Sequence, residues 1–275
     1  MNEEVFAAAN DALTRGETVA LVTIVRAQGS TPQRVGSKML VYADGRTVGT
    51  IGGGCYEHDA FGKARQAIIT GSPALVRYEL SDDFAEENGL ICGGQMDVYI
   101  EPLTAAPRLY IIGAGHVGWH LGRLAHEAGY RIHVIDDREK FANGDRFPGA
   151  AEIIVDDISA WLASADLPAD AYVAVVTRGH QHDLSALRAL ANRPLRYLGM
   201  IGSRAKVTRV YDALAAEGIS ADALKAVHAP IGLDIGAVTP AEIAVSILAE
   251  MIAVRHGRIA TAAQPLRYEP KTLTR

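Results

Sequence analysis

The chain contains 275 residues; 49% of them are hydrophobic, 21% are charged, and the formal net charge at pH 7 is −5. This length exceeds the usual size of one hydrophobic core, so two domains are expected. The acidic balance argues against a nucleic-acid partner, because proteins that bind phosphate backbones carry a basic surface. No uninterrupted apolar stretch of about 18 residues occurs, so neither a transmembrane helix nor a membrane partner is expected.

The cysteine content and the first residues of the chain bear on its location. Two cysteines are too few for a disulfide framework in a chain of this length. Residues 1–4 also lack the basic-then-apolar order of a signal peptide. A reducing, cytoplasmic location is therefore expected.

Residues 1–101 are predicted to form a small N-terminal α+β domain that carries both cysteines. Apolar residues at helical spacing predict a first helix, and an Asp-Gly turn at 44–45 between two apolar runs predicts a hairpin. The predicted elements are helices at 5–13 and 55–68 and strands at 18–25, 37–42, 47–51, 74–80 and 96–100.

Residues 102–107 have the composition of a linker, and the pattern then changes to alternating strands and helices. This alternation predicts a Rossmann-like doubly wound parallel sheet over residues 108–258, followed by a C-terminal tail at 259–275. Thr239, Pro240 and Glu242 together mark the start of a last long helix. Strands are predicted at 108–112, 131–135, 152–155, 171–176 and 195–200, and the fold class is α/β.

Both cysteines lie directly against glycine runs, which let a ligand or another backbone approach closely. Cys55 follows Gly52, Gly53 and Gly54, whereas Cys92 precedes Gly93 and Gly94. Two thiols in such positions indicate a soft metal, a sulfur-bearing ligand or redox chemistry. The structural alternative is a pair of buried thiols packed beneath glycine turns.

The sequence Gly113-x-Gly115-x-x-Gly118 follows a predicted strand and opens a predicted helix, as a dinucleotide-binding turn requires. Such glycines allow a pyrophosphate to approach the helix N-terminus. His116 is interpreted as a neighbour of this turn, and Asp136, at the end of the second strand, as the acceptor for a ribose. The alternative is a turn kept only for packing the helix against the strand.

Two further polar segments follow predicted strands, where ligands of open parallel sheets collect. Arg178 and His180 follow the run at 171–176, and the pair His180-x-His182 is explained more simply as an exposed loop than as a metal site. Ser203, Arg204 and Lys206 follow the run at 195–200 and suit a phosphate, although a solvated helix start is an almost equal alternative.

These motifs, in this order, resemble the xanthine dehydrogenase accessory proteins of the XdhC/CoxI family. The resemblance spans most of the chain and departs from the family at Ala229, where serine is frequent. The motifs that carry it are Gly-Ser-Thr-Pro at 29–32, the run at 49–55, Cys-Gly-Gly at 92–94, Gly-Ala-Gly-His-Val at 113–117, Asp-Asp-Arg at 136–138, and the segments 201–206, 228–236 and 239–244.

The resemblance implies a chaperone that binds the molybdenum cofactor, protects it and delivers it to a xanthine dehydrogenase-type molybdenum hydroxylase. It also implies a cysteine desulfurase partner, which places sulfur on the molybdenum before insertion, and a homodimer is expected. By this analogy Cys55 and Cys92 contact the molybdenum or the pterin dithiolene. The Rossmann turn would then bind the phosphate of molybdopterin, or the nucleotide of a dinucleotide form.

Two other functions are compatible with the residues. One is an NAD(P)-dependent oxidoreductase with a thiol active site, which the glycine turn and Asp136 favour but which lacks an evident proton donor set. The other is a regulatory protein that senses a nucleotide. A cofactor chaperone, unlike the first of these, would not be a turnover enzyme.

Overall fold

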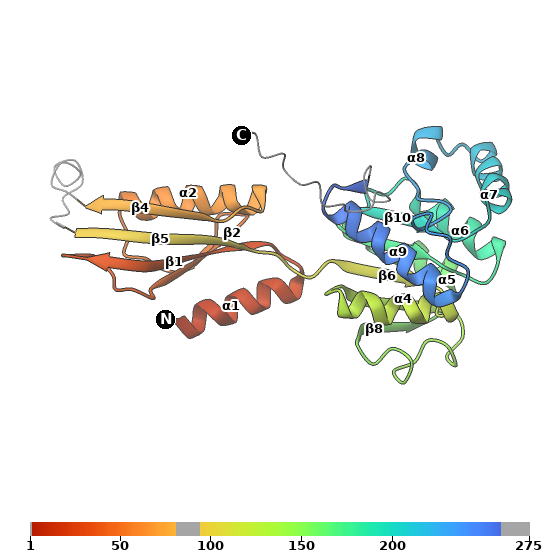
Figure 1. Cartoon of the computed structure of the whole chain (residues 1–275), viewed down its shortest axis with the longest axis horizontal. Helices are drawn as coiled ribbons and strands as arrows, with labels where there is room; N and C mark the ends of the chain where they lie inside the picture. Colours follow the sequence, from red (N-terminus) through yellow and green to blue (C-terminus); the bar gives the residue numbers. More distant parts are fainter. Residues whose placement is uncertain (1, 81–93, 260–275) are drawn as a thin grey trace, which may run out of the picture. The chain divides into compact units, whose positions relative to one another are not determined.

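Two five-stranded sheets organise the chain (Figure 1). A computed structural model describes residues 2–80 and 94–259, and the chain divides into two compact units, residues 1–106 and residues 107–275. Within the described residues no helix is both long and apolar enough to cross a membrane.

The first unit is an antiparallel sheet with strand order β3-β2-β1-β5-β4. Helices α1 and α2 cover its two opposite faces (Figure 1). Alternation along β1 creates both cores, since Ala20, Val22 and Ile24 pack with α2 whereas Val19 and Leu21 pack with α1. The elements are α1 (Asn2–Arg15), β1 (Val19–Gln28), β2 (Lys38–Tyr42), β3 (Thr47–Gly49), α2 (Cys55–Thr70), β4 (Ala74–Leu80) and β5 (Gly94–Leu103).

Strand β5 is longer than the sequence predicts and takes in the first two residues of the predicted linker. Pro102 pairs with Ala20 and Leu103 with Val19. Strand β4 begins opposite Ile100, so β5 pairs with β1 alone beyond that point. Pro102 is tolerated in β5 because the side of β5 that faces away from β1 has no partner strand there, so no backbone N–H is needed on that side.

The second unit is a parallel sheet with strand order β10-β9-β6-β7-β8, as the predicted α/β fold class requires. Helices α4 and α9 pack on one face, and α5, α6, α7 and α8 pack on the other. The strands are β6 (Arg108–Ile112), β7 (Arg131–Asp136), β8 (Ala150–Val155), β9 (Tyr172–Val175) and β10 (Tyr197–Met200). The helices are α4 (His116–Glu127), α5 (Ile158–Ser164), α6 (His180–Leu190), α7 (Arg204–Ala216), α8 (Ala221–Lys225) and α9 (Pro240–Arg255).

The start of α9 confirms the prediction from its sequence. The Thr239 hydroxyl accepts a hydrogen bond from the Glu242 backbone N–H, and the Glu242 carboxylate accepts one from the Thr239 N–H. This reciprocal pair satisfies two N–H groups that a helix start leaves unbonded.

Strand order places a potential ligand site between β6 and β9. From β6 the chain builds β7 and β8 on one side, and it then crosses to build β9 and β10 on the other. Such a reversal opens a crevice at the carboxyl ends of the two central strands.

Candidate functional site

The glycine turn that follows β6 has the conformation its sequence predicts. Gly113 has a φ of 111°, and a Cβ there would lie 2.6 Å from the Val176 carbonyl oxygen. A Cβ on Gly118 would clash with the Gly113 carbonyl oxygen, so these two glycines are needed for packing. Gly115 has no such neighbour within 4 Å, and it begins α4 without a side-chain cap.

A second uncapped helix start lies at the same edge of the sheet, on its other face. Gly179 begins α6, which follows β9, and no side chain caps it either. The strands β6 and β9 are neighbours, so both helix starts belong to the edge where the strand order reverses. Backbone N–H groups at such positions suit an anionic ligand.

Asp136 does not present the free carboxylate that the sequence analysis expects for a ribose. It is 1% exposed, and its carboxylate accepts hydrogen bonds from the Ala114 N–H at 2.7 Å and from Arg138. The Arg138 guanidinium binds both oxygens, at 2.8 and 2.9 Å. Asp136 thus ties the glycine turn to the segment after β7, and a ribose would have to displace Arg138 to reach it.

The charge of Asp136 is favoured by these contacts. Burial alone would raise the pKa of the Asp136 carboxyl, but the hydrogen bonds from Arg138 and from the Ala114 N–H bring it below its ordinary value. The carboxylate is therefore a fixed anion inside the turn.

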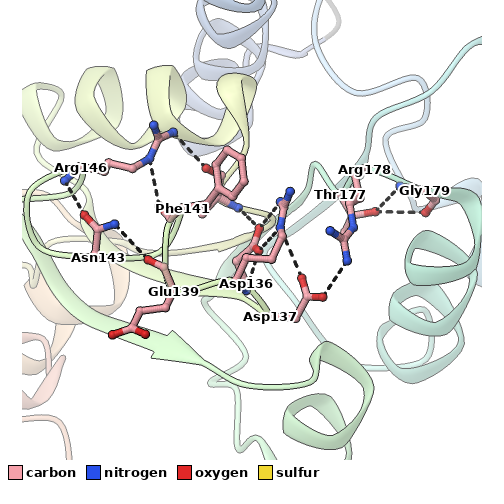
Figure 2. Close-up of polar contacts among 11 residues, drawn as sticks. Asp136, Asp137, Glu139, Phe141, Asn143, Arg146, Thr177, Arg178 and Gly179 are labelled. Carbon is pink, nitrogen blue, oxygen red and sulfur yellow. Dashed lines mark hydrogen bonds and ion pairs between the residues drawn. The ribbon is translucent and has the colours of Figure 1, made fainter.

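Arg178, a predicted ligand contact, lies at the same edge. Its guanidinium binds the Asp137 carboxylate at 2.7 Å (Figure 2). Asp137 follows β7 and Arg178 follows β9, and β6 lies between these strands, so the ion pair joins segments on either side of the glycine turn. About half of the Arg178 side chain remains exposed.

Arg138 and Arg146 lie close to the glycine turn, although the sequence motifs did not mark them as candidate site residues. The Arg146 guanidinium donates to the Phe141 carbonyl at 3.0 Å (Figure 2). It also donates to the carbonyl of Ala114, a residue of the glycine turn, at 3.2 Å. The Arg138 guanidinium lies 4.0 Å from the centre of the Phe141 ring. Arg138 could have been found from the sequence because it directly follows Asp136 and Asp137, whereas no motif or spacing in the sequence points to Arg146.

The residues at the start of α7 divide into two groups. Ser203 caps the helix as predicted, by accepting a hydrogen bond from the Lys206 N–H at 3.3 Å. The Lys206 ammonium, however, pairs with the buried carboxylate of Asp183 and donates to the Ile201 carbonyl. Lys206 is therefore already paired within the fold, and its phosphate contact stays a prediction.

Arg204 stands at the rim of a cavity of about 550 Å³ beyond β10. The cavity lies between the start of α7, the segment 230–237 and α9. This is again the carboxyl edge of the sheet, one strand further from the crevice.

In the first unit, Cys55 is an exposed free thiol at the first residue of α2. The preceding loop is organised by Glu57, whose carboxylate accepts hydrogen bonds from four donors. These are the Thr50 hydroxyl at 2.5 Å and the backbone N–H groups of Ile51, Gly52 and Gly53 at 2.9, 3.2 and 3.1 Å.

The Glu57 contacts change the interpretation of the glycine run. Gly52 and Gly53 were expected to offer their backbones to a ligand, but their N–H groups are bonded to Glu57. Burial would raise the pKa of Glu57, yet the hydrogen bonds from Thr50 and the loop lower it overall. What the loop presents is the exposed sulfur of Cys55.

Close packing brings three of the glycine motifs of the first unit together. A Cβ on Gly52 would lie 2.7 Å from the Pro32 side chain, and a Cβ on Gly94 would clash with the Ser30 carbonyl oxygen. The segment at 29–32 thus contacts both the loop before Cys55 and the start of β5. Cys92 and Gly93 lie outside the described residues, so their predicted roles stay predictions.

Two predicted site histidines are the first residues of helices at the carboxyl edge of the parallel sheet. His116 is exposed at the first residue of α4, beside the glycine turn, and His180 is the first residue of α6. In the ranges 2–80 and 94–259, no group of three or more His, Cys, Asp and Glu side chains is arranged to hold a metal ion.

The fold and the site define a two-unit protein with a Rossmann-like domain and an exposed thiol in its N-terminal unit. The XdhC Rossmann domain matches residues 109–251, and the XdhC and CoxI family matches residues 12–79. The chain belongs to the XdhC and CoxI family.

Three relatives and one solved structure extend this comparison. YqeB of Escherichia coli K12 is 36% identical over 86% of the chain, which spans only 43% of the length of YqeB. A probable xanthine dehydrogenase subunit of Bacillus subtilis 168 is 25% identical, over 87% of this chain and 94% of that protein. The molybdenum cofactor insertion chaperone PaoD of Escherichia coli K12 is 27% identical, over 89% of this chain and 86% of PaoD.

The solved structure is that of a xanthine dehydrogenase from Bacillus halodurans, with a TM-score of 0.53 and 24% identity. The likeness covers 95% of this chain and 98% of that one. At this identity it shows the fold alone.

Proposed function

We propose that the chain binds the molybdenum cofactor and delivers it to a xanthine dehydrogenase-type molybdenum hydroxylase. The observation that carries the proposal is membership of the XdhC and CoxI family together with similarity to a molybdenum cofactor insertion chaperone along 89% of the chain. The Bacillus subtilis relative, named for xanthine dehydrogenase, supports the class of target enzyme.

The second unit supplies a place for the anionic part of the cofactor. Gly115 and Gly179 begin helices without side-chain caps on opposite faces of the sheet, after the neighbouring strands β6 and β9. Arg178 follows β9, and half of its side chain is exposed although its guanidinium pairs with Asp137. Free N–H groups and a guanidinium are donors that a phosphate accepts. We assign the phosphate of molybdopterin, or the nucleotide of a dinucleotide form, to this edge.

The first unit supplies sulfur. Cys55 is exposed, and a thiolate is a soft ligand that suits molybdenum or a dithiolene sulfur. Cys92, which lies outside the described residues, is assigned the same role because it too stands against a glycine run in the sequence. A cysteine desulfurase that sulfurates the bound cofactor, and a homodimer, complete the proposal.

Co-purification tests this function. The chain is purified from cells with an active molybdopterin pathway, and molybdenum and pterin are then quantified. We expect both at near one equivalent per chain, and at least tenfold less molybdenum for Cys55→Ala. Glu79→Gln, on β4, serves as the control that keeps full loading.

Two results would contradict the proposal. Tight NAD(P) without pterin would favour the oxidoreductase instead. Full activation of the target hydroxylase by the double variant Cys55→Ala, Cys92→Ala would show that the thiols have no role in delivery. Whether the chain binds the cofactor would then be decided by the pterin content of the purified variant.

A further inference from the structure

The last helix of the second unit, α9, presents apolar side chains to solvent as well as to the core. On its inner side Ala244, Ile247 and Met251 are buried in the core that α9 shares with α4. On its outer side Val245 is 48% exposed and Ile252 is 38% exposed. A surface helix normally has a polar outer side, and a helix that is apolar on all sides is normally buried. Within the described residues this outer side stays open, so it is a candidate interface.

The exposed large apolar residues on and around α9 recur every seven positions. Val238 and Ile259, which flank the helix, are 81% and 43% exposed, and they continue the spacing of Val245 and Ile252. Leu248, which is half-buried, divides the interval between the two helical residues into three and four positions. This repeat of three and four is the pattern that two α-helices use when they pack side by side at a shallow angle.

Two copies of α9 that pack antiparallel use the whole repeat. A two-fold axis between Leu248 and Ala249 places Val245 of one copy opposite Ile252 of the other. The side chain of Ala249 is small, so the two helices can approach closely at the axis. A two-fold interface is built from the same patch on both copies, so each contact occurs twice.

The same arrangement pairs the charges at the two ends of α9. Glu242 lies in the first turn and Arg255 is the last helical residue, and both are exposed. With the axis between Leu248 and Ala249, Glu242 of each copy lies opposite Arg255 of the other. In a parallel pair each of these charges would instead meet its like. Charge complementarity therefore favours the antiparallel pair.

A cavity of about 430 Å³ adjoins the N-terminal half of this face. Ala241, Glu242 and Val245 line it, together with residues of α4 and of the segment 147–150. In the antiparallel pair the C-terminal half of the second copy's α9 faces this cavity. Stable interfaces bury about 1,200–2,000 Å² in total, and the rim of the cavity extends the contact beyond the helix itself.

We propose that α9 forms the interface of a homodimer, in which the outer sides of two α9 helices pack antiparallel about a two-fold axis between Leu248 and Ala249. The inference names the surface of the homodimer that the proposed function includes, and it rests on that part of the proposed function. It does not depend on the cofactor.

Analytical ultracentrifugation of the full chain, from about 1 to about 100 µM, measures the dissociation constant of the dimer. Ile252→Glu should raise this constant about tenfold or more, because it places two carboxylates against the apolar contact. The matched control is Ile69→Glu on α2, where the isoleucine is 76% exposed in the first unit. It should dimerise like the wild type. Both positions are exposed, so both variants should keep the wild-type melting temperature.

The charges at the helix ends are tested separately. Arg255→Glu places a carboxylate opposite Glu242 of the other copy, twice in each dimer, and should raise the dissociation constant about threefold or more at low salt. Arg209→Glu, at an exposed position of α7, is the control for a reversed charge and should match the wild type. Glu242 itself is left unchanged because its carboxylate caps α9.

Cross-linking tests the position of the axis. Ala249→Cys is made together with Cys55→Ser and Cys92→Ser, so that residue 249 carries the only thiol. Mild oxidation should then join two copies through residue 249, because this residue lies at the axis. Ile69→Cys in the same background should not cross-link.

The inference is wrong if the chain is monomeric up to about 100 µM. It is also wrong if the chain dimerises but Val245→Glu and Ile252→Glu leave the dissociation constant unchanged. A wild-type monomer whose activation of the target hydroxylase is lost in Ile252→Glu would show that this face binds the hydroxylase instead of a second copy.

Failure of the inference is distinct from failure of the proposed function. A wild-type dimer that Ile252→Glu dissociates, but that holds neither molybdenum nor pterin, would overturn cofactor delivery and leave the interface standing. A monomer that holds both at one equivalent would overturn the interface alone.

Discussion

Asp136 and Glu57 are carboxylates whose hydrogen bonds stay within their own units. Each accepts backbone N–H bonds from a glycine-containing loop, Asp136 from the turn after β6 and Glu57 from the loop before Cys55. An anion bound by several N–H groups fixes the course of a loop whose glycines would otherwise be free to move. Both residues therefore shape the candidate sites without having to touch a ligand.

Replacing Asp136 should mainly lower the free energy of unfolding, because the carboxylate bonds to the protein itself. In Asp136→Asn the Arg138 guanidinium loses a buried partner, and removing one member of a buried ion pair costs about 3–5 kcal/mol. Urea denaturation measures the free energy of unfolding. The control is Asp137→Asn, where the side chain is 30% exposed and the expected loss is below about 1 kcal/mol. Equal losses would show that Asp136 has no special structural role.

At the scale of elements, the glycine turn combines a packing role with a binding role. Gly118 holds α4 against β6, because a Cβ there would meet the Gly113 carbonyl oxygen. Gly115 begins α4 with open space around it and with a φ of −65°, which any residue adopts. The two glycines can therefore be tested separately.

Gly118→Ala should lower the melting temperature by several degrees, because the helix must move away from the strand. Gly115→Ala should leave the melting temperature within about a degree of the wild type while it weakens phosphate-bearing ligands, since a methyl group then stands before the helix N-terminus. Thermal denaturation and calorimetric titration measure the two effects. A large loss of stability in Gly115→Ala would contradict this division of roles.

Much of the secondary structure is predictable from local sequence, and the differences have local causes. The Asp-Gly turn at 44–45 and the cap at Thr239 give a hairpin and a helix start where expected. Strand β5 runs beyond its predicted end because its pairing with β1 continues past the end of β4. Pro102 in the sequence indicates a linker, and only the pairing of Pro102 with Ala20 shows that β5 continues beside β1.

At the scale of the whole molecule, three carboxylates make stability depend on pH in the same direction. The pKa values of Asp136, Glu57 and Glu250 all lie below their ordinary values, because hydrogen bonds to the charged form outweigh the opposing effect of burial. A carboxyl group with a lowered pKa in the folded state stabilises the protein above its unfolded pKa. That contribution is lost as the pH falls through the folded pKa.

The melting temperature should therefore be level near neutral pH and fall as the pH drops below about 4.5, where unfolded carboxyl groups bind protons that the folded ones do not. His133 adds to the loss from about pH 6.5 downward, since burial lowers the pKa of its imidazole. Scanning calorimetry from about pH 8 to about pH 3 measures this dependence. In Glu250→Gln the fall below about pH 4.5 should be shallower, and an unchanged slope would contradict the account.

The sequence by itself determined the two-unit organisation of the elements, the glycine turn, the helix caps and the family, because these depend on periodicity and on short motifs. Only the tertiary structure decided which charged groups remain for a ligand. Asp136 bonds to a backbone N–H 22 residues away, and Lys206 pairs with Asp183 of a different helix. A buried charge requires a partner, and that partner is chosen by folding rather than by spacing along the chain. The same folding leaves Cys55 exposed, and it leaves half of the Arg178 side chain exposed although its guanidinium pairs with Asp137.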